Sequence, residues 1–155
     1  MVREYDPNDL PAIVALFERS VHQIACRDYT PAQLAAWAPE RPDLDAWARR
    51  LSTGGVFVSE REDRLAGFAR IDESGELDLL YVDPLLERQG VAAELFDSVA
   101  AWSRRNGIVQ LTANVSITAR PFLERMGFRV LQSQVVEREG VTLENFRMEC
   151  GILKR

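Results

Sequence analysis

Residues 79–95 read LLYVDPLLERQGVAAEL, and this stretch is the most informative part of the sequence. It predicts a strand that ends at Asp83-Pro84, then a turn, and then a long amphipathic helix that begins beside Gly90. The first N–H groups of a helix have no partner within it, and a glycine lets the backbone come close to a ligand. We therefore expect an anion site at this turn, of a kind that suits a pyrophosphate.

The turn differs from two familiar phosphate-binding loops. It contains a single glycine, whereas dinucleotide-binding turns are glycine-rich, and no Lys-Ser/Thr pair closes it as in an NTPase loop. Taken by itself, the stretch is also compatible with an ordinary strand–turn–helix connection that binds nothing.

The rest of the chain predicts one continuous domain, residues 1–155, of the mixed α/β (α+β) class. No repeat, low-complexity tract or linker divides it. The capping pattern Thr30-Pro31-Ala32-Gln33 is typical of a helix start, and Thr118 is the expected N-cap of a later helix that contains Pro121. Hydrophobic periodicity predicts strands over 1–5, 56–59, 65–71, 76–82, 108–113, 128–137 and 141–150, and helices over 8–24, 30–38, 44–51, 91–105 and 119–126.

Composition excludes several classes of protein. Hydrophobic residues make up 46% and charged residues 28%, which is typical of a soluble globular protein. A net charge of −5 disfavours nucleic-acid and membrane partners, and no apolar run approaches the roughly 18 residues of a membrane span. Two cysteines and one histidine cannot form the usual zinc cluster or a disulfide framework. We expect a cytoplasmic protein without a metal.

A second informative segment follows the strand predicted over 108–113. Asn114 precedes ARPFLERMGF at 119–128. With the turn at 87–92, this segment resembles the GNAT superfamily of acetyl-CoA-dependent N-acetyltransferases, whose signatures are Arg/Gln-x-x-Gly-x-Gly/Ala and an Asn followed by a helix ending Phe-Tyr-Glu-Lys-x-Gly-Phe. Residues 19–38, with Tyr29, Gln33 and Trp37-Ala38, further resemble a bacterial subset with Tyr-x-x-x-Gln-x-x-x-Trp-Ala.

The resemblance implies a fold, a cofactor and a set of binding residues. The fold would be a central, mostly antiparallel, twisted sheet of about seven strands flanked by helices. The activity would be transfer of an acetyl group from acetyl-CoA to a primary amine of a small molecule or peptide, by direct attack. The residues expected to bind acetyl-CoA are Leu80, Tyr81, Val82, Arg88, Gln89, Gly90, Val91, Ala92, Asn114 and Phe122.

Two positions depart from the family pattern. Glu87 stands where the first signature has Arg or Gln, so its carboxylate should point away into solvent if the turn binds pyrophosphate. Leu123 stands where many members have the tyrosine that protonates the departing thiolate. Tyr29, Tyr81 and Cys150 are possible substitutes. The missing tyrosine also leaves open a second function, a non-catalytic acyl-CoA sensor or interaction domain.

Two carboxylates on one predicted strand are candidates for the base that deprotonates the amine. Asp78 and Glu76 lie two residues apart, so both should project from the face that also carries Leu80 and Val82. Partial burial among apolar residues should raise their pKa and make them better bases. We favour Asp78, with Glu76 second. The alternative is that both are polar positions of a half-exposed sheet.

The acceptor is expected to contact the first two long helices. Tyr29, Gln33 and Trp37 follow an i, i+4 spacing, which predicts one substrate-binding face, although a tryptophan at helical spacing is more often a core residue. The edge formed by the strands over 128–149 suits a homodimer. The sequence does not determine which amine is the acceptor.

Overall fold

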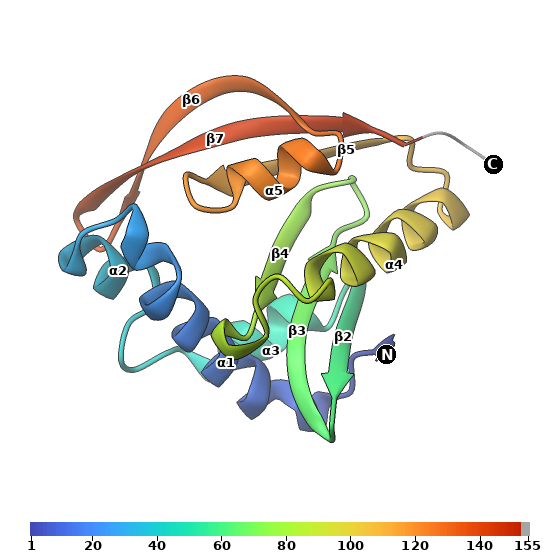
Figure 1. The fold of residues 1–155 in the computed structure, drawn as a ribbon, viewed down its shortest axis with the longest axis horizontal. Coiled ribbons are helices and arrows are strands. Elements are labelled where there is room, and N and C mark those ends of the chain that lie inside the picture. Colours follow the sequence, from blue (N-terminus) through green and yellow to red (C-terminus); the bar gives the residue numbers. More distant parts are fainter. Residues whose placement is uncertain (153–155) are drawn as a thin grey trace.

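The computed structural model describes residues 1–152, and its strands form two antiparallel sheets (Figure 1). The first has the order β1-β2-β3-β4 and the second the order β5-β7-β6. Within residues 1–152, a parallel bridge between Glu76, just before β4, and Thr112 of β5 joins them. The strands are β1 (Val2–Glu4), β2 (Gly55–Arg61), β3 (Arg64–Ile71), β4 (Leu77–Val82), β5 (Gln110–Ser116), β6 (Arg129–Arg138) and β7 (Val141–Gly151).

Helices cover both faces of the first sheet. On one face α1 packs with Phe68 and Leu79 in a buried cluster, and on the other α4 packs against Ala69 and Ile71. No helix within residues 1–152 is both long and apolar enough to cross a membrane. The helices are α1 (Leu10–Gln23), α2 (Pro31–Trp37), α3 (Leu44–Leu51), α4 (Val91–Arg105) and α5 (Arg120–Arg125), with short 3-10 turns η1 (Pro7–Asp9), η2 (Ala25–Arg27) and η3 (Pro84–Leu86).

Local residue types account for two of these elements. Thr30 Oγ1 accepts from the backbone N–H of Gln33, whose side-chain oxygen accepts from the N–H of Thr30, so the predicted capping box begins α2. The hairpin between β2 and β3 turns at Glu62 and Asp63, both with positive φ (52° and 63°), a conformation that matches the twist of a two-residue hairpin.

The start of α5 differs from the prediction. Its N-cap is Ala119, not Thr118, and Pro121 therefore lies in the first turn of the helix. The Thr118 hydroxyl instead donates to Asp28 over 2.8 Å, while Ser116 Oγ accepts from the N–H of Ala119. The hydrogen bond to Asp28, which is distant in the sequence, thus engages the Thr118 side chain that local sequence predicts as the N-cap.

Candidate active site

Asp83 fixes the turn that follows β4. Its side chain is buried, and its carboxylate accepts from the N–H of Leu85 over 2.9 Å, from Arg64 over 2.7 Å and from Arg19 over 3.0 Å. Burial alone would raise the pKa of Asp83, but these hydrogen bonds and charges outweigh it and lower the pKa. An ionised carboxylate therefore ties the end of β4 to β3 and α1.

The turn itself presents backbone groups to solvent. Arg88 and Gly90 have positive φ (64° and 82°), and Gly90 is the N-cap of α4, which has no side-chain cap. Arg88, Gln89 and Gly90 are exposed, and a Cβ on Gly90 would meet nothing within 4 Å. Free N–H groups at the start of a 15-residue helix, facing open space, fit a diphosphate group. Val91 is buried, so only its backbone faces the turn.

Glu87 does not point freely into solvent, and that expectation was wrong. Its carboxylate accepts a hydrogen bond from Arg27, on η2, over 2.8 Å. Arg27 therefore offsets the negative charge of Glu87, the residue at which this turn departs from the family signature. Arg27 lies 60 residues away in the sequence and carries no signal of this role.

A β-bulge breaks the regular alternation of β4. Arg70 lies opposite Leu79, whereas the next residue, Ile71, lies opposite Leu77, so Asp78 is the extra residue of β4. Leu77 and Leu80 consequently share the α4 side, while Leu79 packs on the α1 side. The expectation that Asp78 shares a face with Leu80 and Val82 is wrong for this reason.

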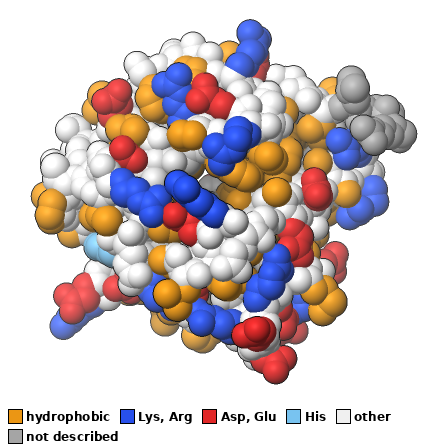
Figure 2. Space-filling model, in the orientation of Figure 1, with side chains coloured by type: hydrophobic (Ala, Val, Ile, Leu, Met, Phe, Trp, Pro, Cys, Tyr) orange, Lys and Arg blue, Asp and Glu red, His pale blue; other side chains and the backbone are white. Residues whose placement is uncertain are grey.

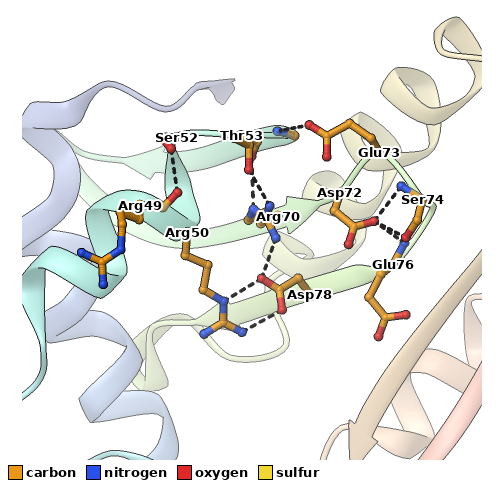
Figure 3. A network of polar contacts seen from close by, with 11 residues as sticks. Arg49, Arg50, Ser52, Thr53, Arg70, Asp72, Glu73, Ser74, Glu76 and Asp78 are labelled. Atoms are coloured by element: carbon orange, nitrogen blue, oxygen red, sulfur yellow. Dashed lines mark hydrogen bonds and ion pairs between the residues drawn. The ribbon is translucent and has the colours of Figure 1, made fainter.

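Asp78 is held between two arginines (Figure 3). Its carboxylate accepts from Arg50 at two atoms, each over 2.7 Å, and from Arg70 over 2.8 Å. Burial by itself would raise the pKa of Asp78, but the hydrogen bonds and charges of Arg50 and Arg70 outweigh it, and the pKa is lowered. The expected rise in pKa was therefore wrong, because the sequence did not indicate the two arginines.

Glu76 lies at the bridge between the two sheets. It accepts from Arg147 on β7 over 2.7 and 2.8 Å and from the hydroxyl of Thr112 on β5 over 2.7 Å. In Figure 3 its side chain points away from Asp78 and toward the second sheet. The two predicted carboxylates thus belong to different ion-pair networks, although both line the same cavity.

This cavity has a volume of about 370 Å³ and lies where β4 and β5 separate. Figure 2 shows a hollow near the middle of the molecular face, with hydrophobic and basic side chains gathered around it. The aromatic residues that line the cavity come from α1, α3 and β4 as well as from the region around α2. They are Phe17, Tyr29, Trp37, Trp47 and Tyr81.

Of the three residues predicted to bind the acetyl acceptor, two line the cavity and one does not. Tyr29 and Trp37 line the cavity, with ring centroids 5.4 Å apart in an edge-to-face arrangement. The Tyr29 hydroxyl donates to the carbonyl of Glu144 over 2.6 Å and accepts from the N–H of Ile117 over 3.0 Å. Gln33 does not line the cavity, because its amide caps α2 and donates to the carbonyl of Thr142.

The predicted acetyl-CoA residues lie along β4 and beyond it. Leu80, Tyr81 and Asn114 line the cavity. The N–H of Asp83 donates to the carbonyl of Ala66 on β3, so the backbone of Asp83 faces β3. Because the backbone groups of successive residues in a strand point to alternate sides, those of Leu80 and Val82 point away from β3.

The second signature contributes mainly to the core. Phe122 packs against the cluster under α4 and does not line the cavity, whereas Leu123 is buried and forms part of the cavity wall. The position of the usual tyrosine is therefore apolar. Cys150 is buried in the core away from the cavity, and burial raises the pKa of its thiol. We therefore remove it from the candidate acids.

Several cavity residues were not predicted. Arg50 pairs with Asp78, and its guanidinium lies 5.6 Å from the ring centroid of Trp47. Glu18 on α1 and Arg138 on β6 also line the cavity. The sequence could have indicated Glu18, because this charged residue lies beside the apolar face of a predicted helix. Nothing in the sequence indicated Arg138.

Comparisons with known proteins identify the family. Residues 25–150 match the family model for the acetyltransferase (GNAT) domain. The chain is 36% identical over 148 residues, covering 95% of this chain and 93% of the relative, to the uncharacterised N-acetyltransferase YafP of Escherichia coli strain K12.

Solved structures show the same fold. A GCN5-related N-acetyltransferase from Rhodopseudomonas palustris superposes with a TM-score of 0.94 at 28% identity, covering 98% of this chain and 95% of that one. The PaiA N-acetyltransferase from Thermoplasma acidophilum, solved with coenzyme A, gives 0.78 at 16% identity, covering 97% and 98%. The predicted mixed α+β fold and N-acetyltransferase activity are confirmed, and the chain belongs to the GNAT acetyltransferase family.

Proposed function

We propose that this N-acetyltransferase moves the acetyl group of acetyl-CoA directly to a primary amine of a small molecule or peptide. One observation carries the proposal: the cavity lies beside β4, and β4 is the strand that leads into the turn at 87–90. Cys26 and Cys150 do not line this cavity, which favours direct attack over transfer through an acetyl-cysteine.

The donor would lie along β4. When bound, acetyl-CoA supplies the acyl thioester whose C–S bond breaks as the new C–N bond forms. The outward backbone groups of Leu80 and Val82 suit pairing with an extended chain, as in addition of a strand. An N–H group of this edge is also a candidate donor to the thioester oxygen, where negative charge develops. The N–H groups from Gln89 to Ala92 would bind the diphosphate.

The charges around the cavity support a cationic acceptor. Five carboxylates line it, and three of them, Glu18, Asp43 and Glu144, lie outside the arginine pairs described above, so these three support binding of an ammonium group. Aromatic walls also suit a cation or an apolar substituent. A volume of about 370 Å³ holds a small amine or one residue of a peptide. The carboxylates are Glu18, Asp43, Glu76, Asp78 and Glu144, and the arginines are Arg50 and Arg138.

The attacking amine must lose a proton to be nucleophilic. Asp78 has a lowered pKa and accepts a proton poorly, so we assign it to holding Arg50 in the cavity wall and to pairing with Arg70 behind it. Glu76, at the junction of β4 and β5, is then the candidate proton acceptor, directly or through a water.

Tyr81 is the candidate acid in place of Leu123. Burial raises the pKa of both Tyr29 and Tyr81, so both hydroxyls remain protonated. Tyr29 already donates its proton to the Glu144 carbonyl. Tyr81 lines the cavity from β4 itself.

Two measurements test the proposal. Calorimetry with coenzyme A tests donor binding, and release of free thiol from acetyl-CoA tests turnover with 2-phenylethylamine, spermidine, a peptide with a free alanine N-terminus and a peptide with a lysine. We expect tight binding and amine-dependent thiol release. Binding without thiol release above background would favour the sensor function instead.

A further inference from the structure

Two side chains of the second sheet hold the carboxylate of Glu76. Arg147 on β7 donates from Nη1 to Oε1 over 2.7 Å and from Nη2 to Oε2 over 2.8 Å. Thr112 on β5 donates from its hydroxyl to Oε2 over 2.7 Å. Glu76 lines the cavity, whereas Arg147 and Thr112 do not. Both therefore act on the cavity through Glu76 rather than by direct contact with an acceptor.

These hydrogen bonds leave one acceptor position of the Glu76 carboxylate open. A carboxylate has about four lone-pair sites, two on each oxygen. Within residues 1–152, Oε2 accepts two hydrogen bonds and Oε1 accepts one. The open position is therefore on Oε1, and this is the atom that can accept a hydrogen bond, and then a proton, from an amine or a water in the cavity.

The guanidinium of Arg147 is itself held by side chains of the second sheet. Arg147 lies opposite Asn114 of β5, and its Nη1 donates to Asn114 Oδ1 over 3.1 Å. Gln134 of β6 donates to the same oxygen over 2.9 Å. All three strands of the second sheet thus contribute to the orientation of Arg147.

The charge of Arg147 opposes the effect of burial on Glu76, whose side chain is 23% exposed. Burial favours the neutral form of a carboxyl group, whereas a cationic donor favours the ionised form. Without Arg147, the hydroxyl of Thr112 would be the remaining side-chain donor within residues 1–152. The other charged or titratable groups around Glu76 are Asp72, which accepts from its backbone N–H, Asp78 with Arg50 and Arg70, Glu149 with Arg129, and, along the cavity, Glu18, Asp43, Glu144, Arg138, Tyr29 and Tyr81.

We infer that Arg147 is a positioning residue, which leaves Oε1 of Glu76 open to the acceptor and keeps the carboxylate ionised. This inference rests on the proposed transfer to a primary amine with Glu76 as the proton acceptor. In that step one proton moves from the ammonium nitrogen to Oε1, and the neutral amine gains the lone pair that forms the C–N bond. The carboxylic acid then returns the proton to water, while Arg147 keeps its own protons.

The pH dependence of kcat/KM tests this role, with the amine that gives the highest thiol release in the panel above. Arg147→Met removes the charge and should move the acidic limb up by about one pH unit, so that kcat/KM falls about tenfold below the limb. Arg147→Lys keeps the charge and should hold the limb within about half a unit of the wild type. If Arg147→Met does not fold, Arg147→Gln removes the same charge, retains N–H donors and should give the same shift.

Arg129→Met is the matched control. Arg129 forms an ion pair with Glu149 on the second sheet, and it does not line the cavity. Its loss should leave the acidic limb where it is in the wild type. The KM for acetyl-CoA should not change in any of these variants. Because the amine is the same throughout, its own ionisation does not account for a difference between variants.

Glu76→Gln separates an effect through Glu76 from a structural one. It should remove the limb that Arg147→Met displaces. In the Glu76→Gln background, Arg147→Met should lower kcat/KM by less than about threefold, because the two residues act as one unit.

Four results would overturn the inference. An unmoved limb in the charge-removing variant, whatever its melting temperature, would mean that Arg147 only joins the two sheets. Full additivity in the double variant would mean that Arg147 does not act through Glu76. A wild-type limb in Glu76→Gln would exclude Glu76 as the proton acceptor while transfer to the amine persists. If the wild type binds coenzyme A but releases thiol with none of the amines, the proposed function itself fails.

Discussion

Both carboxylate oxygens of Asp78 accept hydrogen bonds from the guanidinium of Arg50, each over 2.7 Å. Arg70 adds a third hydrogen bond, to Oδ2, over 2.8 Å. This arrangement makes Asp78 an ionised anchor for Arg50 in the cavity wall and for Arg70 on β3, and it separates the role of Asp78 from that of Glu76 on the same chain segment.

Asp78→Asn should therefore lower kcat/KM without changing its pH midpoint. Because the lowered pKa keeps Asp78 ionised at neutral pH, its titration does not produce the acidic limb of the profile. We expect about a tenfold loss at every pH from about 6 to 9, caused by the displaced arginines. Asp45→Asn, on the exposed surface of α3, is the control. Disappearance of the acidic limb in Asp78→Asn would instead identify Asp78 as the base.

Gly90→Ala tests the phosphate-binding turn. Its φ of 82° should cost about 1 kcal/mol of folding free energy when a Cβ is present, although nothing lies within 4 Å of that Cβ. Gly107, beyond the other end of α4, has a φ of 74° and equally open surroundings, so Gly107→Ala carries the same backbone penalty. We expect similar losses of melting temperature, but weaker coenzyme A binding by calorimetry only in Gly90→Ala. Equal affinities in the two variants would argue against diphosphate binding at Gly90.

Arg27→Ala should weaken coenzyme A binding because it leaves the Glu87 charge beside the diphosphate site. We expect a loss of about threefold to tenfold at low salt, smaller at high salt because the pair is partly exposed. The double variant Arg27→Ala/Glu87→Ala should recover most of the affinity. A double variant as weak as Arg27→Ala would mean that Arg27 contacts the ligand itself.

Asp83→Asn should lower the free energy of unfolding at neutral pH and make that free energy depend less on pH in the acidic range. The folded pKa of Asp83 lies below its unfolded value, so its contribution is present above the unfolded pKa and is lost as the pH falls through the folded one. Because the carboxylate is buried against two arginines, we expect a loss of about 3 kcal/mol at neutral pH. Urea unfolding between about pH 7 and pH 3 measures both effects. Asp97→Asn, on an exposed position of α4, should leave the curve unchanged, and an acid dependence that persists in Asp83→Asn would assign it to other carboxylates.

Tyr81→Phe tests the candidate acid. Loss of the hydroxyl should lower kcat by about tenfold or more, with a small change in the KM for acetyl-CoA. Tyr29→Phe is the comparison, since its hydroxyl bonds two backbone groups and its loss should lower the melting temperature more than kcat. An unchanged kcat in Tyr81→Phe would mean that the thiolate leaves without help from this residue.

The sequence was sufficient wherever a short stretch dictates its own backbone conformation. The capping box at Thr30 and Gln33 and the glycine at the start of α4 follow from residue types a few positions apart. The hydrophobic periodicity of 91–105 likewise predicted α4 at the bounds that the structure has. Interactions within one turn of helix or one hairpin need no knowledge of the rest of the fold.

Prediction failed where a distant residue competes for a side chain. Thr118 binds Asp28 rather than capping α5, and Glu87 binds Arg27 rather than water. The bulge at Asp78 changed the face that its side chain occupies, since one extra residue in a strand reverses the alternation beyond it.

The sequence by itself determined the family, the order of the elements and the location of the phosphate-binding turn, because these depend on local patterns and on two motifs in register. Only the tertiary structure decided that Asp78 is paired with Arg50 and that Glu76 is paired with Arg147. The physical reason is that strand pairing and helix packing bring these groups together across 28 and 71 residues of chain, and their charges and hydrogen bonds depend on that placement.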